Sequence, residues 1–105
     1  DSESLNLLVG AQNIVAQSLV MQGELDKAMD HFYQALELNS HAAATNFHLS
    51  LPLARAGLLE EALLRCSEAL RLKPDYRGAK QHLQQIRQRI KLHKPSNGRP
   101  FGGGL

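Results

Sequence analysis

Apolar residues recur along the chain at steps of three and four, and this spacing predicts five helices separated by short polar breaks. The first helix is expected from residue 1 to about residue 22, opened by the capping sequence Asp1-Ser-Glu-Ser. We expect its core-facing stripe to consist of Leu5, Leu8, Ile14, Val15 and Leu19.

Three further helices are predicted over about residues 26–38, 43–56 and 60–72. Gly23 and Gly57 stand ahead of the second and fourth helices, where the preceding helix should end on a residue with positive φ. The predicted core of the second helix comprises Ala28, Met29, Phe32, Ala35 and Leu36. The predicted core of the fourth helix comprises Ala62, Leu63, Cys66, Ala69 and Leu70.

Pro52 is the unusual residue of the third predicted helix. A proline inside a helix removes one backbone hydrogen bond and collides with the carbonyl four residues earlier, here that of His48. Apolar periodicity nevertheless continues through Leu49 and Leu53 to Ala56. We therefore expect the helix to kink at Pro52 rather than to break there.

A fifth helix is predicted over about residues 77–93, with a narrow apolar stripe of Ala79, Leu83, Ile86 and Ile90. Its other positions are mostly Gln, Lys, Arg and His, as expected for an outer helix that ends a stack and meets water. Residues 95–105 are rich in Gly and Pro and predict a flexible tail, so the folded domain is expected to span residues 1–94.

One stretch of this pattern occurs twice, and the offset between its two copies is constant. Gly23-Glu-Leu-Asp-Lys-Ala28 corresponds to Gly57-Leu-Leu-Glu-Glu-Ala62, and Ala35-Leu-Glu-Leu38 corresponds to Ala69-Leu-Arg-Leu72. A fixed period in this range is typical of repeat architectures. Ala28 and Ala62 are small residues at equivalent positions of the two copies. At these positions two helices would cross closely, which a larger side chain would prevent.

The period and its marked positions resemble the tetratricopeptide repeat (TPR) family. The first repeat would span about residues 9–42 and the second about 43–76, with a capping helix over about 77–93. The small and apolar positions match, whereas Gln12 and Asn46 stand where the family pattern has Trp. The resemblance implies an all-α fold, a right-handed superhelical stack of antiparallel helical hairpins.

The same resemblance implies a concave groove, lined by the first helix of each pair, that binds a peptide or a helix. Carried over by position, its residues are Asn13, Gln17, Val20, Ala44, Phe47, His48, Leu51, Ala54, Gln81, His82 and Gln85. Phe47, Leu51 and Ala54 follow helical spacing apart from the Leu49 and Leu53 stripe, so they would form an apolar centre. The alternative is that this central helix is simply buried on three sides.

The net charge of +2 conceals a gradient along the chain. Residues 1–39 carry a net charge of −5, residues 40–76 carry 0, and residues 77–105 carry +7. Such asymmetry indicates an anionic partner or end-to-end self-association. The plain alternative is a terminal helix whose charges are simply solvated.

The sequence predicts no catalytic site, metal site or cofactor. The His residues form no i, i+4 pair, Gly102-Gly-Gly104 has no following helix, and no nucleophile–base–acid arrangement stands out. Cys66 is expected to be a packed, inert thiol. We do not expect nucleic-acid binding, because Phe101 alone follows Tyr76 as an aromatic for base stacking. No apolar run approaches the roughly 20 residues of a membrane span.

These features predict a non-catalytic protein–protein interaction module that holds a peptide or helix in its groove. Two alternatives stay open: an accessory segment of a larger enzyme such as a glycosyltransferase, and a self-assembly module that joins the acidic start to the basic end. The chain begins with Asp1 and has two repeats where arrays usually need about three, so we expect a piece of a longer protein. The partner and the compartment stay open, with the cytoplasm as the default.

Overall fold

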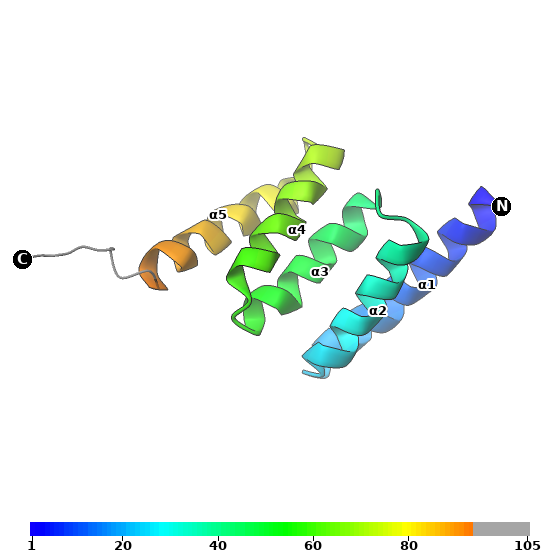
Figure 1. Cartoon of the computed structure of the whole chain (residues 1–105), viewed down its shortest axis with the longest axis horizontal. Coiled ribbons are helices and arrows are strands. Elements are labelled where there is room, and N and C mark those ends of the chain that lie inside the picture. Colours follow the sequence, from blue (N-terminus) through cyan, green and yellow to red (C-terminus); the bar gives the residue numbers. More distant parts are fainter. Residues whose placement is uncertain (94–105) are drawn as a thin grey trace, which may run out of the picture.

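Five helices follow one another along residues 1–93, the part of the chain that the computed structural model describes, and no strand occurs among these residues (Figure 1). They are α1 (Ser2–Met21), α2 (Leu25–Leu38), α3 (Ala43–Arg55), α4 (Leu59–Leu72) and α5 (Arg77–His93). The predicted all-α class is confirmed, and every predicted helix is present. The tail predicted over residues 95–105 lies outside the described residues.

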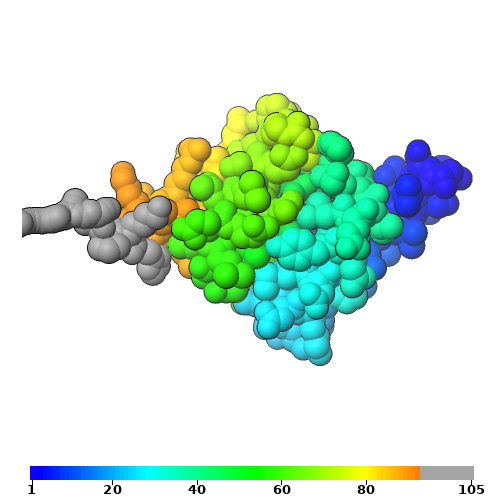
Figure 2. Space-filling model, viewed as in Figure 1, coloured from blue at the N-terminus to red at the C-terminus, as the bar shows by residue number. Residues whose placement is uncertain are grey.

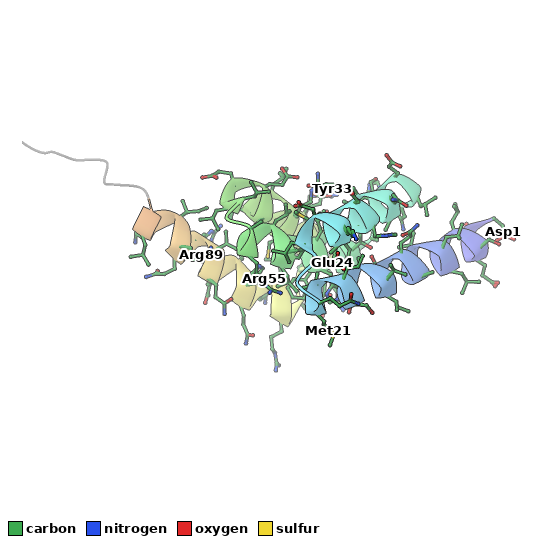
Figure 3. The ribbon with its side chains drawn as sticks, turned by 90° about the horizontal axis from the view of Figure 1, so that it is seen from below. Asp1, Met21, Glu24, Tyr33, Arg55 and Arg89 are labelled. Carbon is green, nitrogen blue, oxygen red and sulfur yellow. The ribbon has the colours of Figure 1, made fainter. Side chains whose placement is uncertain are left out.

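Neighbouring helices pack against one another in chain order (Figure 1). Helices α1 and α2 form one antiparallel hairpin, α3 and α4 form a second, and α5 packs on α4. Helix α3 also contacts α1 and α5, so the odd-numbered helices adjoin on one side of the array. Helices α2 and α4 lie on the opposite side (Figure 3).

The two hairpins turn in the same way at Gly23 and Gly57, where φ is 81° and 83°. A Cβ makes this conformation costly, which favours glycine. The Gly23 N–H donates to Val20 O at 3.0 Å and the Glu24 N–H donates to Leu19 O at 2.9 Å. The same two bonds close α3 one repeat later. This pair of bonds is a Schellman motif, so the predicted helix ends at both glycines are confirmed.

All the predicted core residues of α2 are buried. Of those predicted for α4 and α5, some are fully buried and the others are partly buried. The buried residues of α2 are Ala28, Met29, Phe32, Ala35 and Leu36. In α4 and α5 the fully buried predicted residues are Ala62, Cys66, Ala69, Ala79 and Ile86. The predicted residues that pack on this core from partly buried positions are Leu63, Leu70, Leu83 and Ile90.

The predicted core stripe of α1 is wrong. Its exposed members are Leu5, Leu8, Ile14 and Val15. The residues of α1 that are buried are Val9 and Ala16, and Leu19 packs on the core from a partly buried position. Helix α1 carries large apolar residues on its outer face as well as on its core face, so periodicity could not select the face that α2 and α3 cover.

By length and composition alone, α1 is able to cross a membrane, since it has 20 residues and an 18-residue window within it has a mean hydropathy of 1.2. The sequence did not predict a span because Asn, Gln and Ser interrupt every apolar run. The mean stays high because residues 4–23 carry no charged side chain. This is weak evidence for a span, because a signal sequence near an N-terminus passes the same test.

Pro52 lies inside α3 without ending it, as predicted, since the helix is continuous over Ala43–Arg55 and the proline is buried. Two side chains bond to carbonyls of the preceding turn. Ser50 Oγ donates to Phe47 O at 2.5 Å, and His82 Nε2 donates to Ser50 O at 3.3 Å. The kink itself stays a prediction.

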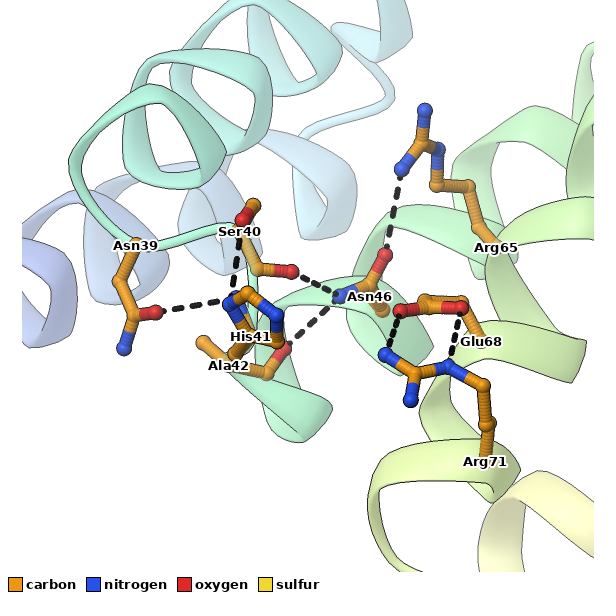
Figure 4. Close-up of polar contacts among 8 residues, drawn as sticks. All are labelled: Asn39, Ser40, His41, Ala42, Asn46, Arg65, Glu68 and Arg71. Carbon is orange, nitrogen blue, oxygen red and sulfur yellow. Dashed lines mark hydrogen bonds and ion pairs between the residues drawn. The ribbon is translucent and has the colours of Figure 1, made fainter.

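A buried asparagine joins the α2–α3 connection to α4 (Figure 4). Asn46 Nδ2 donates to Ala42 O at 3.0 Å and to Ser40 O at 3.4 Å. Its Oδ1 accepts from Arg65 Nη1 at 3.3 Å, and Arg65 Nε pairs with Glu61 at 3.1 Å. A buried amide is costly unless its polar atoms are bonded, and this network bonds both ends of Asn46.

A similar link occurs one repeat earlier, between α1 and α2. Gln12 Oε1 accepts from His31 Nδ1 at 2.7 Å, and Gln12 Nε2 donates to Gln34 Oε1 at 3.1 Å. Gln12 and Asn46 occupy equivalent positions of the two repeats, and so do His31 and Arg65. The two hairpins therefore share equivalent polar links as well as equivalent turns.

Candidate functional site

A cavity of about 240 Å³ opens between α1 and α3. Its lining residues are Gln17, Val20, Met21, Phe32, His48 and Leu51. Four of them are predicted groove residues, and the buried Phe32 ring reaches the cavity from the core of α2. The lining is mostly apolar, with the Gln17 amide and the His48 imidazole as its polar groups.

Burial lowers the pKa of His48 below its ordinary value of 6.5. The imidazole is therefore neutral at neutral pH, when one ring nitrogen donates and the other accepts a hydrogen bond. None of the described residues that line the cavity has a charged side chain. The site suits an apolar group with a hydrogen-bonding neighbour better than it suits an ion.

A second group of predicted residues gathers around Phe47, where α3 meets α5. The centroid of the Phe47 ring lies 5.0 Å from that of Tyr76 and 6.2 Å from that of His82. A Cβ at Gly78 would lie only 3.1 Å from Phe47 Cζ, so a larger residue at position 78 would require the Phe47 ring to shift by a few tenths of an ångström. Phe47 is half-buried, packs against the core and joins α3 to the start of α5.

Other predicted residues lie outside the cavity. Ala54 is 2% exposed and belongs to the core, so it does not continue an apolar groove from Leu51. Asn13 bonds to the Thr45 hydroxyl at 2.9 Å and thereby ties α1 to α3. Ala44 is exposed near the start of α3.

The predicted residues of α5 form a third group. Gln81 and Gln85 border a separate hollow on the surface of α5, together with Gln84, Gln88 and Arg89. The predicted groove residues therefore fall into three groups on adjoining helices, and the cavity between α1 and α3 holds four of them.

Sequence reasoning missed three residues that shape this cavity or its edge. Met21 lies one turn after Gln17, so helical spacing offered a signal for it. Phe32 was assigned to the core alone. Arg55 Nη1 donates to Val20 O at 3.3 Å, where the guanidinium meets the negative end of the α1 dipole (Figure 3). Nothing in the sequence pattern indicates that long-range contact.

Cys66 is a packed thiol, as predicted. Its Sγ donates to Ala79 O at 3.1 Å, and burial raises its pKa, which disfavours the reactive thiolate. Among the residues described, no three His, Cys, Asp or Glu side chains come together to hold a metal ion. The cavity between α1 and α3 can bind through apolar contact and hydrogen bonds.

No family model matches the sequence, and no curated protein matches it either. A function for the chain therefore has to be argued from the cavity and from the repeated hairpins.

Proposed function

We propose that this chain is a non-catalytic protein-binding module, and that the cavity between α1 and α3 holds an apolar side chain of a peptide or helix. The size of the cavity, about 240 Å³, is the observation that carries this proposal. Pockets for small-molecule ligands usually enclose about 300–1,000 Å³. A single anchoring side chain of an amphipathic helix fits the smaller volume better.

The proposal includes the architecture around the cavity. The two hairpins are TPR-like repeats in a right-handed stack, and α5 is the capping helix. This reading is supported by the constant offset between the repeated segments, by the equivalent turns at Gly23 and Gly57, and by the equivalent links of Gln12 and Asn46. The odd-numbered helices would then line the concave face, and the cavity lies between two of them.

A displayed library of short amphipathic helical peptides tests this function directly. Peptides selected on the wild-type chain are titrated against Leu51→Lys, which places an ammonium group in the apolar cavity, and against Ser67→Lys. Ser67 is exposed on α4 and supplies the same added charge away from the cavity. We expect affinity to fall at least about tenfold for Leu51→Lys and to be unchanged for Ser67→Lys.

A thermal melt of each variant accompanies the titration, because Leu51 is half-buried. Peptides that bind a folded Leu51→Lys variant as tightly as the wild type would place the binding surface elsewhere. A library that yields no binder for the wild-type chain also counts against the proposal.

A further inference from the structure

Most of the large apolar side chains that are exposed among the described residues lie on α1. Leu7, Ile14 and Met21 are 75%, 67% and 87% exposed. No charged side chain occurs between Ser4 and Gln22. The N-terminal part of α1 projects beyond the other helices (Figure 2), and Met21 points away from them at the other end (Figure 3). An uncharged, exposed apolar stripe of this length indicates a covering partner.

The spacing of this face is that of a coiled-coil seam. Large apolar residues recur every seven positions at Leu7, Ile14 and Met21. Small residues recur with the same period at Ser4, Ala11 and Ser18, and all six side chains are exposed. Steps of three and four that alternate in this way keep one stripe facing a second helix.

We propose that α1 pairs with α1 of a second copy of this chain, antiparallel and around a two-fold axis between residues 12 and 13. The large and small positions are self-complementary only in this direction. Ser4 then faces Met21 of the other copy, Leu7 faces Ser18, and Ala11 faces Ile14. Each layer holds one large and one small side chain, which lets the helices interdigitate closely.

A parallel pair lacks this complementarity. In that direction Leu7 meets Leu7 and Ser4 meets Ser4, so wide layers alternate with voids. Leu8 and Val15, which follow the seam residues Leu7 and Ile14, flank the same seam and are also exposed in the single chain. Pairing therefore removes further apolar surface from water at the edge of the seam.

The charges near α1 favour a second copy over a membrane surface. Helices that lie in a membrane interface typically carry Lys or Arg on a polar face, and α1 carries neither. Its opposite face is held by Val9 and Ala16 in the core, so insertion across a bilayer would require α1 to leave the array. Two copies of an uncharged seam meet without charge repulsion along their length.

The seam predicts a reversible dimer. A helix of 20 residues is about 30 Å long. One such helix pair buries less than the roughly 1,200 Å² at the lower limit of standard interfaces, which suggests a micromolar dissociation constant. The surface is separate from the proposed peptide site except at Met21, which also lines the cavity.

Sedimentation equilibrium of the 105-residue chain tests the pairing, over about 1 to 500 μM protein and at about 50 and 500 mM salt. We expect a monomer–dimer equilibrium that stops at two copies. Added salt should leave it unchanged or strengthen it, because the seam is apolar and the register brings Glu3 near the acidic Glu24 end of the other copy.

Two substitutions in the seam and one control on α5, all at exposed positions, sharpen the test. Ile14→Lys places an ammonium group beside the two-fold axis and should weaken the dimer at least about tenfold, whereas Gln84→Lys on α5 should have no effect. Ala11→Leu should also weaken it at least about tenfold, because the small position opposite Ile14 becomes too large. Non-specific association of apolar surfaces would instead strengthen with Ala11→Leu.

Four results would overturn the proposal: a monomer at every concentration, open-ended assembly that salt weakens, tighter association of Ala11→Leu, or binding of the monomer to phosphatidylcholine vesicles without self-association. Open-ended assembly would favour contact between the acidic start and the basic end. Circular dichroism of Ile14→Lys and Ala11→Leu checks that each monomer keeps its helices, which we expect from the exposure of both positions.

Discussion

The two ends of the array cover their core with helices of opposite character. Helix α5 buries Ala79 and Ile86 and turns mostly Gln, Lys and Arg side chains outward, with Leu92 exposed near its end, so most of its outer face is compatible with water. Helix α1 buries Val9 and Ala16 and turns Leu7, Ile14 and Met21 outward. An amphipathic end helix completes a stack, whereas an end helix that is apolar on both sides leaves a second surface to be covered.

The largest expected effect is on the free energy of unfolding, when one isoleucine at each end of the array is changed to alanine. Ile86→Ala should lower the free energy of unfolding by about 2–5 kcal/mol, because Ile86 is fully buried and its removal leaves a cavity. Ile14→Ala should change it by no more than about 0.5 kcal/mol, because Ile14 is already in water. Urea melts at about 1 μM protein, where the proposed dimer is dissociated, make the comparison.

Equal costs for Ile86→Ala and Ile14→Ala would contradict the comparison. They would mean that α1 packs through its outer face in the single chain. The melts also report whether α5 unfolds with the rest, because separate transitions for two probes would show that an end helix frays by itself.

A smaller loss of stability is expected when the alanine at the helix crossing of each hairpin is enlarged. Ala28 and Ala62 are fully buried at equivalent positions of the two repeats. Either alanine changed to Leu should overpack its helix crossing and cost about 1–3 kcal/mol. Ala11→Leu, on the exposed face of α1, is the matched control and should be neutral in the monomer. Similar stability for all three variants would contradict a close helix crossing at Ala28 and Ala62.

The fold was largely predictable because its signals are local. Gly23 and Gly57 mark helix ends through a backbone conformation that glycine adopts most readily, and the structure places both at positive φ. The stripe of α5 was predictable because Arg, Lys and Gln occupy the remaining faces, so one orientation alone buries apolar residues. The same rule failed on α1, where no charged residue marks an outer face.

The candidate site was less predictable because it depends on contacts between distant parts of the chain. Ala54 has the spacing of a groove residue but faces the core. The Phe47 ring packs against Tyr76, just before α5, and lies close to Gly78 in α5. Both contacts depend on how the second hairpin packs against α5. Helical periodicity places a residue on a face of its own helix, but the neighbour of that face is a tertiary property.

The smallest expected effect is a dependence of stability on pH that arises from His48, on the side of α3 that faces α1. Burial lowers the pKa of His48 in the folded chain, whereas the unfolded chain keeps a value near 6.5. Above that value both states are neutral at this site, and the stability is fully present. As the pH falls below it, the unfolded chain takes up the proton first, so the free energy of unfolding decreases toward the folded pKa.

Urea melts between about pH 8 and pH 5 should show this loss in the wild type and a smaller loss in His48→Gln. His41→Gln, which alters an exposed side chain, is the control and should retain the wild-type dependence. A selected peptide that fills the cavity shields His48 further from water, so its affinity should also decrease as the pH falls, in the wild type but not in His48→Gln. If both chains lose affinity equally, the peptide does not occupy the cavity beside His48.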